Sequence, residues 1–140
     1  MSERAFDANV RLWLHKRYFP FGQWENNKTG YGESYHAPFG GKGGADLVGW
    51  LGPLHIEIEN KTRRGQLKTE QKLRQARMTK PWGPLYVVCR ETGEFDAQGI
   101  DEGFNELCRV IDAHARRWLP LSMLDTLRIV WCPEDGRAAL

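Results

Sequence analysis

The stretch from Ala45 to Lys61, ADLVGWLGPLHIEIENK, predicts the central part of the fold. It contains two apolar runs, 45–51 and 54–61, separated by Gly52-Pro53. The second run alternates between apolar and polar residues, which is typical of a strand with one buried face. Glycine can adopt the positive φ that the first position of a type II′ turn requires. The stretch therefore predicts an antiparallel hairpin in which Leu51 lies opposite Leu54.

This register brings two acidic residues together. Counting back from the turn, Asp46 lies opposite Glu59, and cross-strand neighbours have Cβ atoms about 5 Å apart. Glu57 and Lys61 lie on the same face of the hairpin, because side chains alternate between faces along a strand. The other face carries only Leu, Ile and Gly, so it is the predicted core side.

Paired carboxylates on one sheet face suggest a cation site. At about 4 Å they repel each other by roughly 4 kcal/mol at an effective dielectric near 20. Mg²⁺ prefers carboxylate oxygens, and Mn²⁺ accepts similar ligands. A lysine such as Lys61 can orient an attacking water and offset phosphoryl charge. The alternative for Glu59 and Lys61 alone is a solvent-exposed strand with an ordinary Glu–Lys pair, but the alignment with Asp46 favours the metal site.

The helices are predicted from caps and apolar spacing. Ser2 is a favourable N-cap for a first helix that runs to about Arg17. A turn and a second helix are expected within 64–80, where Leu73, Ala76 and Arg77 are predicted to form a narrow buried face. A third amphipathic helix is predicted over 104–118.

Further strands are predicted at 85–90 and 127–132, where mostly apolar runs occur. Residues 20–44 hold seven of the fifteen glycines and are expected to be irregular, apart from a short strand near 23–26. This order of elements predicts an α/β domain with a mixed central sheet flanked by helices.

Size and composition limit the class of protein. The chain has 140 residues, 41% of them hydrophobic, which fits one globular domain. No apolar run approaches the ~18 residues of a membrane span, and the first ten residues lack the apolar core of a signal peptide. The three cysteines form no CxxC pair, so neither a disulfide framework nor a zinc knuckle is expected. These features indicate a cytoplasmic protein without a membrane segment.

The charge is concentrated in one segment. Residues 61–80 carry eight basic side chains and one acidic side chain, although the whole chain has a net charge of only +2. Such a block suits a polyanion such as nucleic acid. The alternative is the solvated face of a surface helix.

Two aromatic features extend this prediction. Most of the six tryptophans fall at apolar positions and are typical of a core. Trp24 and Trp82 are flanked by loop residues and are candidates for stacking on bases. His55 could lie at the rim of the site or simply on the surface.

Several motifs together resemble a nuclease family. They are Gly44-Ala45-Asp46, Glu59-Asn60-Lys61, and the run ExKxxxGxLxxxQ from Glu59 to Gln71. They are similar to the PD-(D/E)xK nuclease superfamily, and more narrowly to its VRR-NUC (virus-type replication–repair nuclease) branch. The resemblance covers about residues 3–90 and implies a restriction-endonuclease-like core within a single domain, 1–140. It leaves a C-terminal helix and strand, about 95–140, as an addition for dimerisation or DNA contact.

The resemblance implies a role for each matching residue. Asp46 and Glu59 would be metal ligands, Lys61 the catalytic lysine, and Gln71 a helix residue that orders the site. The backbone carbonyl of Asn60 would also face the metal, and Glu3 resembles an acidic residue of the first helix that adds to the metal shell. Two features depart from the family: Ala45 replaces a proline, and Glu57 adds a carboxylate that could take part in binding a second ion.

The expected activity is Mg²⁺- or Mn²⁺-dependent, structure-selective cleavage of DNA. The bound metal would activate a water molecule and polarise the scissile phosphate. Phosphate contacts, which position DNA without reading its sequence, are expected from Lys42, Arg63, Arg64, Lys68 and Lys72. Small VRR-NUC proteins resemble Holliday-junction resolvases and flap nucleases, which implies branched DNA, a homodimer, and the cytoplasm of a bacterial or phage-infected cell. The alternatives are a non-catalytic nucleic-acid-binding module on the same fold, and an interaction protein with a basic helix.

Overall fold

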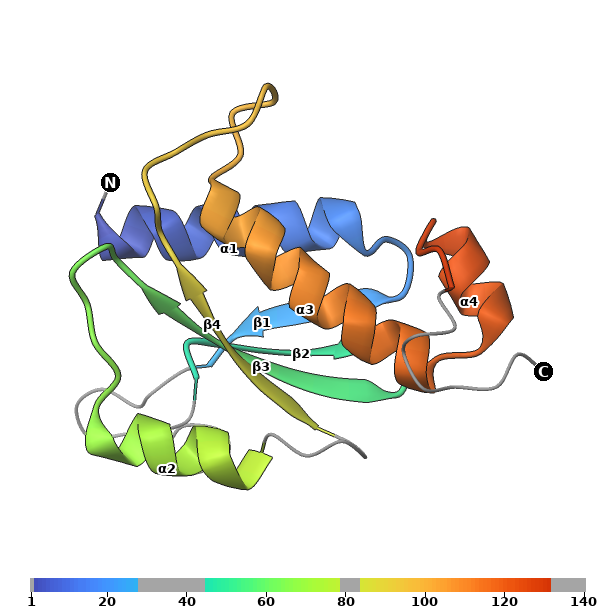
Figure 1. The fold of residues 1–140 in the computed structure, drawn as a ribbon, viewed down its shortest axis with the longest axis horizontal. Helices are drawn as coiled ribbons and strands as arrows, with labels where there is room; N and C mark the ends of the chain where they lie inside the picture. Colours follow the sequence, from blue (N-terminus) through green and yellow to red (C-terminus); the bar gives the residue numbers. More distant parts are fainter. Residues whose placement is uncertain (1, 28–44, 79–83, 132–140) are drawn as a thin grey trace.

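The computed structural model describes residues 2–27, 45–78 and 84–131. The helices are α1 (Glu3–Arg17), α2 (Thr69–Met78), α3 (Glu102–Trp118) and α4 (Leu121–Thr126), and the strands are β1 (Gly22–Asn26), β2 (Leu47–Leu51), β3 (Leu54–Lys61) and β4 (Leu85–Arg90) (Figure 1). One sheet has the strand order β1-β2-β3-β4. The first three strands are antiparallel, and β4 runs parallel to β3. The predicted α/β class and mixed sheet are confirmed.

The hairpin has the predicted register. Leu51 pairs with Leu54, and Val48 pairs with Glu57 further along the ladder. Gly52 has a φ of 57°, a value that residues with a Cβ rarely adopt. Its backbone N–H donates to the carbonyl of Phe21, 3.0 Å away, which ties the turn to the start of β1. The local sequence of the turn therefore places every side chain of β3 on its predicted face.

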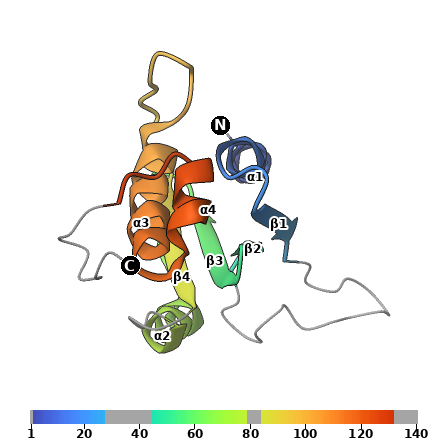
Figure 2. The same cartoon turned by 90° about the vertical axis from the view of Figure 1, so that its right-hand side faces the viewer.

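The two faces of the sheet are covered differently. Helices α1 and α3 lie over one face, and α2 lies against the other (Figures 1 and 2). The α1–α3 side is the apolar core, where Trp13 of α1 meets Phe104 of α3 with ring centroids 5.2 Å apart. Its buried side chains include Phe6, Val10 and Leu14 of α1, Ile56 and Ile58 of β3, and Leu107 and Ile111 of α3. Helix α3 thus contributes to the same hydrophobic core as the β-hairpin.

The first helix begins as predicted. The hydroxyl of Ser2 accepts a hydrogen bond from the N–H of Ala5 at 3.2 Å, so Ser2 is the N-cap of α1. Within the three described ranges, no helix is both long and apolar enough to cross a membrane.

The predicted buried face of α2 is wrong. Leu73, Ala76 and Arg77 are all exposed, and 58% of the Leu73 surface is accessible to solvent. The side of α2 that meets the sheet instead carries Gln71 and Arg74, which bond to carboxylates of β3. Apolar spacing could not identify this face, because polar contacts attach the helix to the sheet.

The predicted final strand is also wrong. Residues 127–131 form no strand, and Cys132 lies outside the described residues. Leu127 and Ile129 are buried in the core cluster, while Val130 is 82% exposed. Arg128 has a φ of 58°, which interrupts the extended conformation. Alternate residues of this segment are therefore buried because the segment packs against the core, although it does not pair with the sheet.

Candidate functional site

The open end of the hairpin brings Asp46 and Glu59 together as predicted. Asp46 directly precedes β2, and its N–H donates to Oε2 of Glu59 at 3.2 Å. In the other direction, the N–H of Asn60 donates to Oδ2 of Asp46 at 2.8 Å. Each carboxylate therefore accepts a bond from the backbone of the opposite strand segment. These bonds fix the position of both side chains.

Lys61 and Gln71 both reach the carboxylate of Glu59. Lys61 Nζ lies 3.3 Å from Oε1 of Glu59, and Nε2 of Gln71 donates to the same oxygen at 2.6 Å. Oε1 of Gln71 accepts the N–H of Lys68 at 2.8 Å, at the N-terminal end of α2. The glutamine thus connects the start of α2 to the carboxylate. The structure brings together Asp46, Glu59, Lys61 and Gln71, four residues predicted to form one site.

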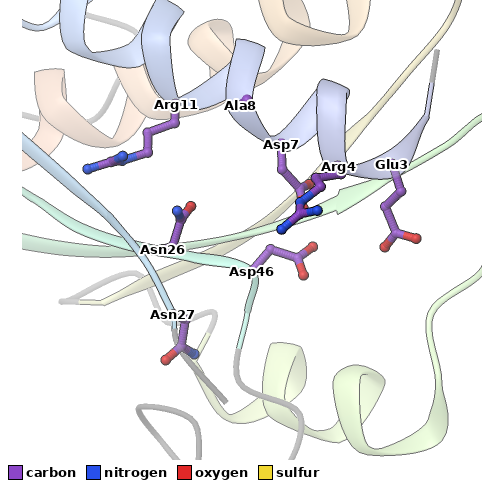
Figure 3. A pocket seen from close by; sticks show the side chains of 8 residues that line it. All are labelled: Glu3, Arg4, Asp7, Ala8, Arg11, Asn26, Asn27 and Asp46. Atoms are coloured by element: carbon purple, nitrogen blue, oxygen red, sulfur yellow. The ribbon is translucent and has the colours of Figure 1, made fainter. Parts of the chain in front are cut away.

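Helix α1 adds a carboxylate that the sequence prediction missed. Asp7 lines a polar pocket of about 740 Å³ together with Glu3 and Asp46, and the three side chains lie near one another in Figure 3. Oδ1 of Asp7 is buried without a hydrogen-bond partner among the described residues. Glu3 and Asp7 are four residues apart and share a helix face, so this spacing was the signal that could have identified Asp7.

Burial and the repulsion between neighbouring carboxylates raise the pKa values of the acidic side chains at this site. Burial, and then the charge of Asp46, raise the pKa of Asp7 to about 6. The same two causes raise the pKa of Glu59 to about 7. Burial also raises the pKa of Asp46 itself. A cation in contact with these oxygens would favour their charged forms.

The donor set fits a hard divalent cation that keeps several waters. Within the described ranges, no three His, Cys, Asp or Glu side chains converge closely enough to form a complete metal site. Mg²⁺ commonly binds one or two carboxylates and fills the remaining positions with water. Asp46 and Glu59 supply two such carboxylates, and Asp7 lines the same pocket as Asp46. The residues present therefore fit a Mg²⁺ or Mn²⁺ ion that takes some of its ligands from the protein and the others from water.

Comparisons with other proteins do not identify the chain. No family model, curated protein or solved structure matches it.

Glu57 is occupied by protein partners. It is fully buried, and its Oε2 lies 2.6 Å from Nη2 of Arg74 and 3.1 Å from Nε2 of His55. Burial alone would raise the pKa of Glu57, but the hydrogen bonds and charges of His55 and Arg74 outweigh it and lower the pKa. The carboxylate attaches α2 to the sheet, so it is not positioned as a free ligand for a second ion.

The predicted phosphate-contacting residues lie around α2. Arg63, Arg64, Lys68 and Lys72 are exposed, as contacts to DNA require. Arg63 and Arg64 line a small pocket of about 420 Å³ with Thr62 and Glu91, beyond the end of β3. Lys42 lies outside the described residues.

Proposed function

We propose that this protein is a Mg²⁺- or Mn²⁺-dependent DNA endonuclease, similar to VRR-NUC nucleases of the PD-(D/E)xK superfamily. The observation that carries the proposal is the convergence of Asp46, Glu59 and Lys61 with Gln71 of α2. A site of this composition combines cation ligands with a lysine ammonium beside them. Neither a structural hairpin nor a passive binding surface requires that combination.

Each residue has a distinct part in the proposed reaction. Asp46 and Glu59 would hold the cation, with the Asn60 carbonyl as the further ligand that the resemblance implies. A cation held there would supply an acidified water molecule and polarisation of the scissile phosphate. Lys61 orients that water and offsets the charge that develops on the phosphate.

Other residues support these groups. Gln71 holds Glu59 in place through its 2.6 Å bond, so it is a positioning residue. Asp7 and Glu3 extend the carboxylate cluster from α1. The basic residues around α2 contact the DNA backbone, which favours recognition of DNA shape over sequence. A homodimer acting on branched or flapped DNA follows from the resemblance and is part of the proposal.

Cleavage of labelled DNA tests the proposal. Four-way junction, flap and linear duplex substrates are incubated with Mg²⁺, with Mn²⁺, or with EDTA. We expect metal-dependent cleavage that falls about 10²–10³-fold in Asp46→Ala and Lys61→Ala, because each change removes a group that acts on the reacting phosphate. Gln71→Ala should lose about 10–100-fold, as supporting contacts to metal ligands do.

The control is Arg109→Ala, which removes an exposed ion pair on α3 and should cleave as well as the unaltered protein. Circular dichroism establishes that each variant is folded. Binding of all three substrates without any cleavage, unaffected by Asp46→Ala and Lys61→Ala, would leave a non-catalytic nucleic-acid-binding module.

A further inference from the structure

The α2 side of the sheet carries a pocket and an exposed tryptophan near β1, away from the contacts of α2 with β3. Arg74 and Gln71 attach α2 over β3, whereas Gln23, Val48 and Trp50 lie on the same face nearer the β1 edge. These three residues line a shallow pocket of about 300 Å³ with Glu25, Gly49 and His55. Trp50 is 47% exposed there. This surface is therefore continuous with the surface that carries the candidate catalytic residues.

Trp50 is held in a defined orientation. It pairs across the hairpin with His55, and their ring centroids lie 4.9 Å apart at an interplanar angle of 53°. Nε2 of His55 lies 3.1 Å from the buried carboxylate of Glu57. That carboxylate is in turn bonded to Arg74 of α2. A chain of contacts from α2 thus fixes the histidine against which the indole packs.

Among the tryptophans with described side chains, Trp50 and Trp118 are exposed, whereas Trp13 and Trp131 pack against the core. Trp24, a sequence-based candidate for stacking, is fully buried in the core. Trp118 is 43% exposed, but it lies at the end of α3, which covers the opposite face of the sheet. Trp82, the second sequence-based candidate, lies outside the described residues. Trp50 therefore combines an exposed ring with a position on the candidate catalytic face.

The distance to the candidate catalytic residues suits a bound DNA strand. Trp50 is four residues along the chain from Asp46 on the same face, which corresponds to about 13 Å at the rise of a β-strand. The intervening position holds Val48, which pairs with Glu25 of β1 and with Glu57 of β3. A strand whose phosphate lies at Asp46 and Glu59 can thus place a base a few nucleotides away over the indole.

We propose that the Trp50–His55 pair is the stacking site for an unpaired base of the DNA substrate. This inference rests on the proposed nuclease function and specifies its substrate class as DNA with a single-stranded segment beside the cleaved bond. Aromatic side chains stack on the faces of bases, and those faces are accessible only where the base is unpaired. A fully paired duplex has no exposed base face for Trp50.

Binding in EDTA tests this inference separately from cleavage. The probes are a fluorescently labelled flap with an unpaired arm and a fully paired duplex of the same length, measured by anisotropy. We expect Trp50→Ala to weaken flap binding about 5- to 150-fold, the effect of losing one stacked base. Duplex binding should change less than twofold. Trp50→Phe should retain most of the flap affinity, whereas Trp50→Leu, which keeps apolar bulk without a ring, should not.

Trp118→Ala is the matched control, since it removes a similarly exposed tryptophan from the opposite side of the sheet. Unchanged flap binding in both Trp50→Ala and Trp50→Leu would overturn the inference, as would an equal loss on flap and duplex. A dimer that dissociates in Trp50→Ala, measured by light scattering, would instead make Trp50 an interface between copies of the chain. Selective loss of flap binding in a protein that never cleaves DNA would support the stacking site and contradict the nuclease proposal.

Discussion

At the scale of single residues, Asp7 is the clearest case of a group placed at a cost to stability. Its pKa is raised from 3.8 to about 6 in the folded protein, chiefly by burial. The native state therefore binds more protons than the unfolded state between these two pH values, so Asp7 makes stability rise as the pH falls from about 7 to about 4. Such unfavourable placement is typical of functional sites rather than structural ones.

Asp7→Asn should therefore stabilise the metal-free protein at pH 7. We expect a gain of about 1 kcal/mol in the free energy of unfolding, because Asp7 is only partly buried and solvent screens its charge. The increase in stability on acidification should be smaller in this variant. Urea denaturation in EDTA from pH 4 to 8 measures both effects. Glu70→Gln, which changes an exposed carboxylate of α2, is the control and should shift the curve by less than about 0.5 kcal/mol. A destabilised Asp7→Asn protein at pH 7 would contradict this explanation.

The structure follows most directly from the sequence where neighbouring residues in the chain determine it. The Gly52-Pro53 turn fixes the register of the hairpin, and that register alone places Asp46 beside Glu59. The spacing of Asp7 from Glu3 places both on one face of α1, but the approach of Asp7 to Asp46 depends on how α1 packs, which this spacing does not specify. The partners of Glu57 were missed for the same reason, since Arg74 reaches it from a helix seventeen residues away.

At the scale of elements, α2 is held by polar contacts rather than by apolar burial. None of its ten residues is buried. Its attachment depends on Arg74, which bonds to Glu57, and on Gln71, which bonds to Glu59. Contacts to two carboxylates of β3 therefore set the position of α2. Glu57 has a structural role, and Glu59 belongs to the candidate active site. This coupling explains why the exposed Leu73 gave a misleading signal about the face that meets the sheet.

Arg74→Ala should detach α2 and disturb the site with it. Removing the arginine takes from the buried Glu57 its guanidinium partner and leaves His55 beside it, so we expect a loss of about 3 kcal/mol in the free energy of unfolding. Cleavage should also fall, because Gln71 loses its fixed approach to Glu59. The matched control is Arg77→Ala on the exposed side of α2, which should cost less than about 0.5 kcal/mol. Denaturant melts measure the difference, and equal effects of the two substitutions would show that the buried ion pair does not hold the helix.

The 127–132 segment illustrates the limit of sequence patterns at this scale. Leu127 and Ile129 alternate with exposed residues as a strand requires, yet the backbone turns at Arg128 and bonds back to α4. Alternating apolar and polar residues indicate which side chains are buried, but they do not indicate which elements bury them. By contrast, β3 and β4 have the predicted bounds, because each is a run of strand-forming residues that ends at a clear change in pattern.

At the scale of the whole molecule, the sheet separates the apolar core on one face from the proposed catalytic residues on the other. The α1–α3 face holds the continuous apolar core, and the α2 face holds the polar network around Glu57 and Glu59. Asp46 and Glu59 lie where that network approaches α1, so the hairpin, α1 and α2 must all be folded before the proposed cation ligands come together. Binding of a cation should consequently be linked to global folding, since an unfolded chain offers no such site.

Mg²⁺ should therefore raise the thermal stability of the whole protein. If the site binds the native state alone, a free Mg²⁺ concentration one hundred times the Kd adds about 2.7 kcal/mol to the free energy of unfolding. Calorimetric or fluorescence melts at increasing Mg²⁺, at constant ionic strength, measure this as a rising Tm. Asp46→Asn should remove most of the response, because the amide keeps the shape of the side chain but loses the charge that attracts the ion. Ca²⁺ provides a second probe, since it also binds oxygen ligands. A Tm that is independent of Mg²⁺, Mn²⁺ and Ca²⁺ in a protein that still binds DNA would contradict the metal site, whatever the outcome at Trp50.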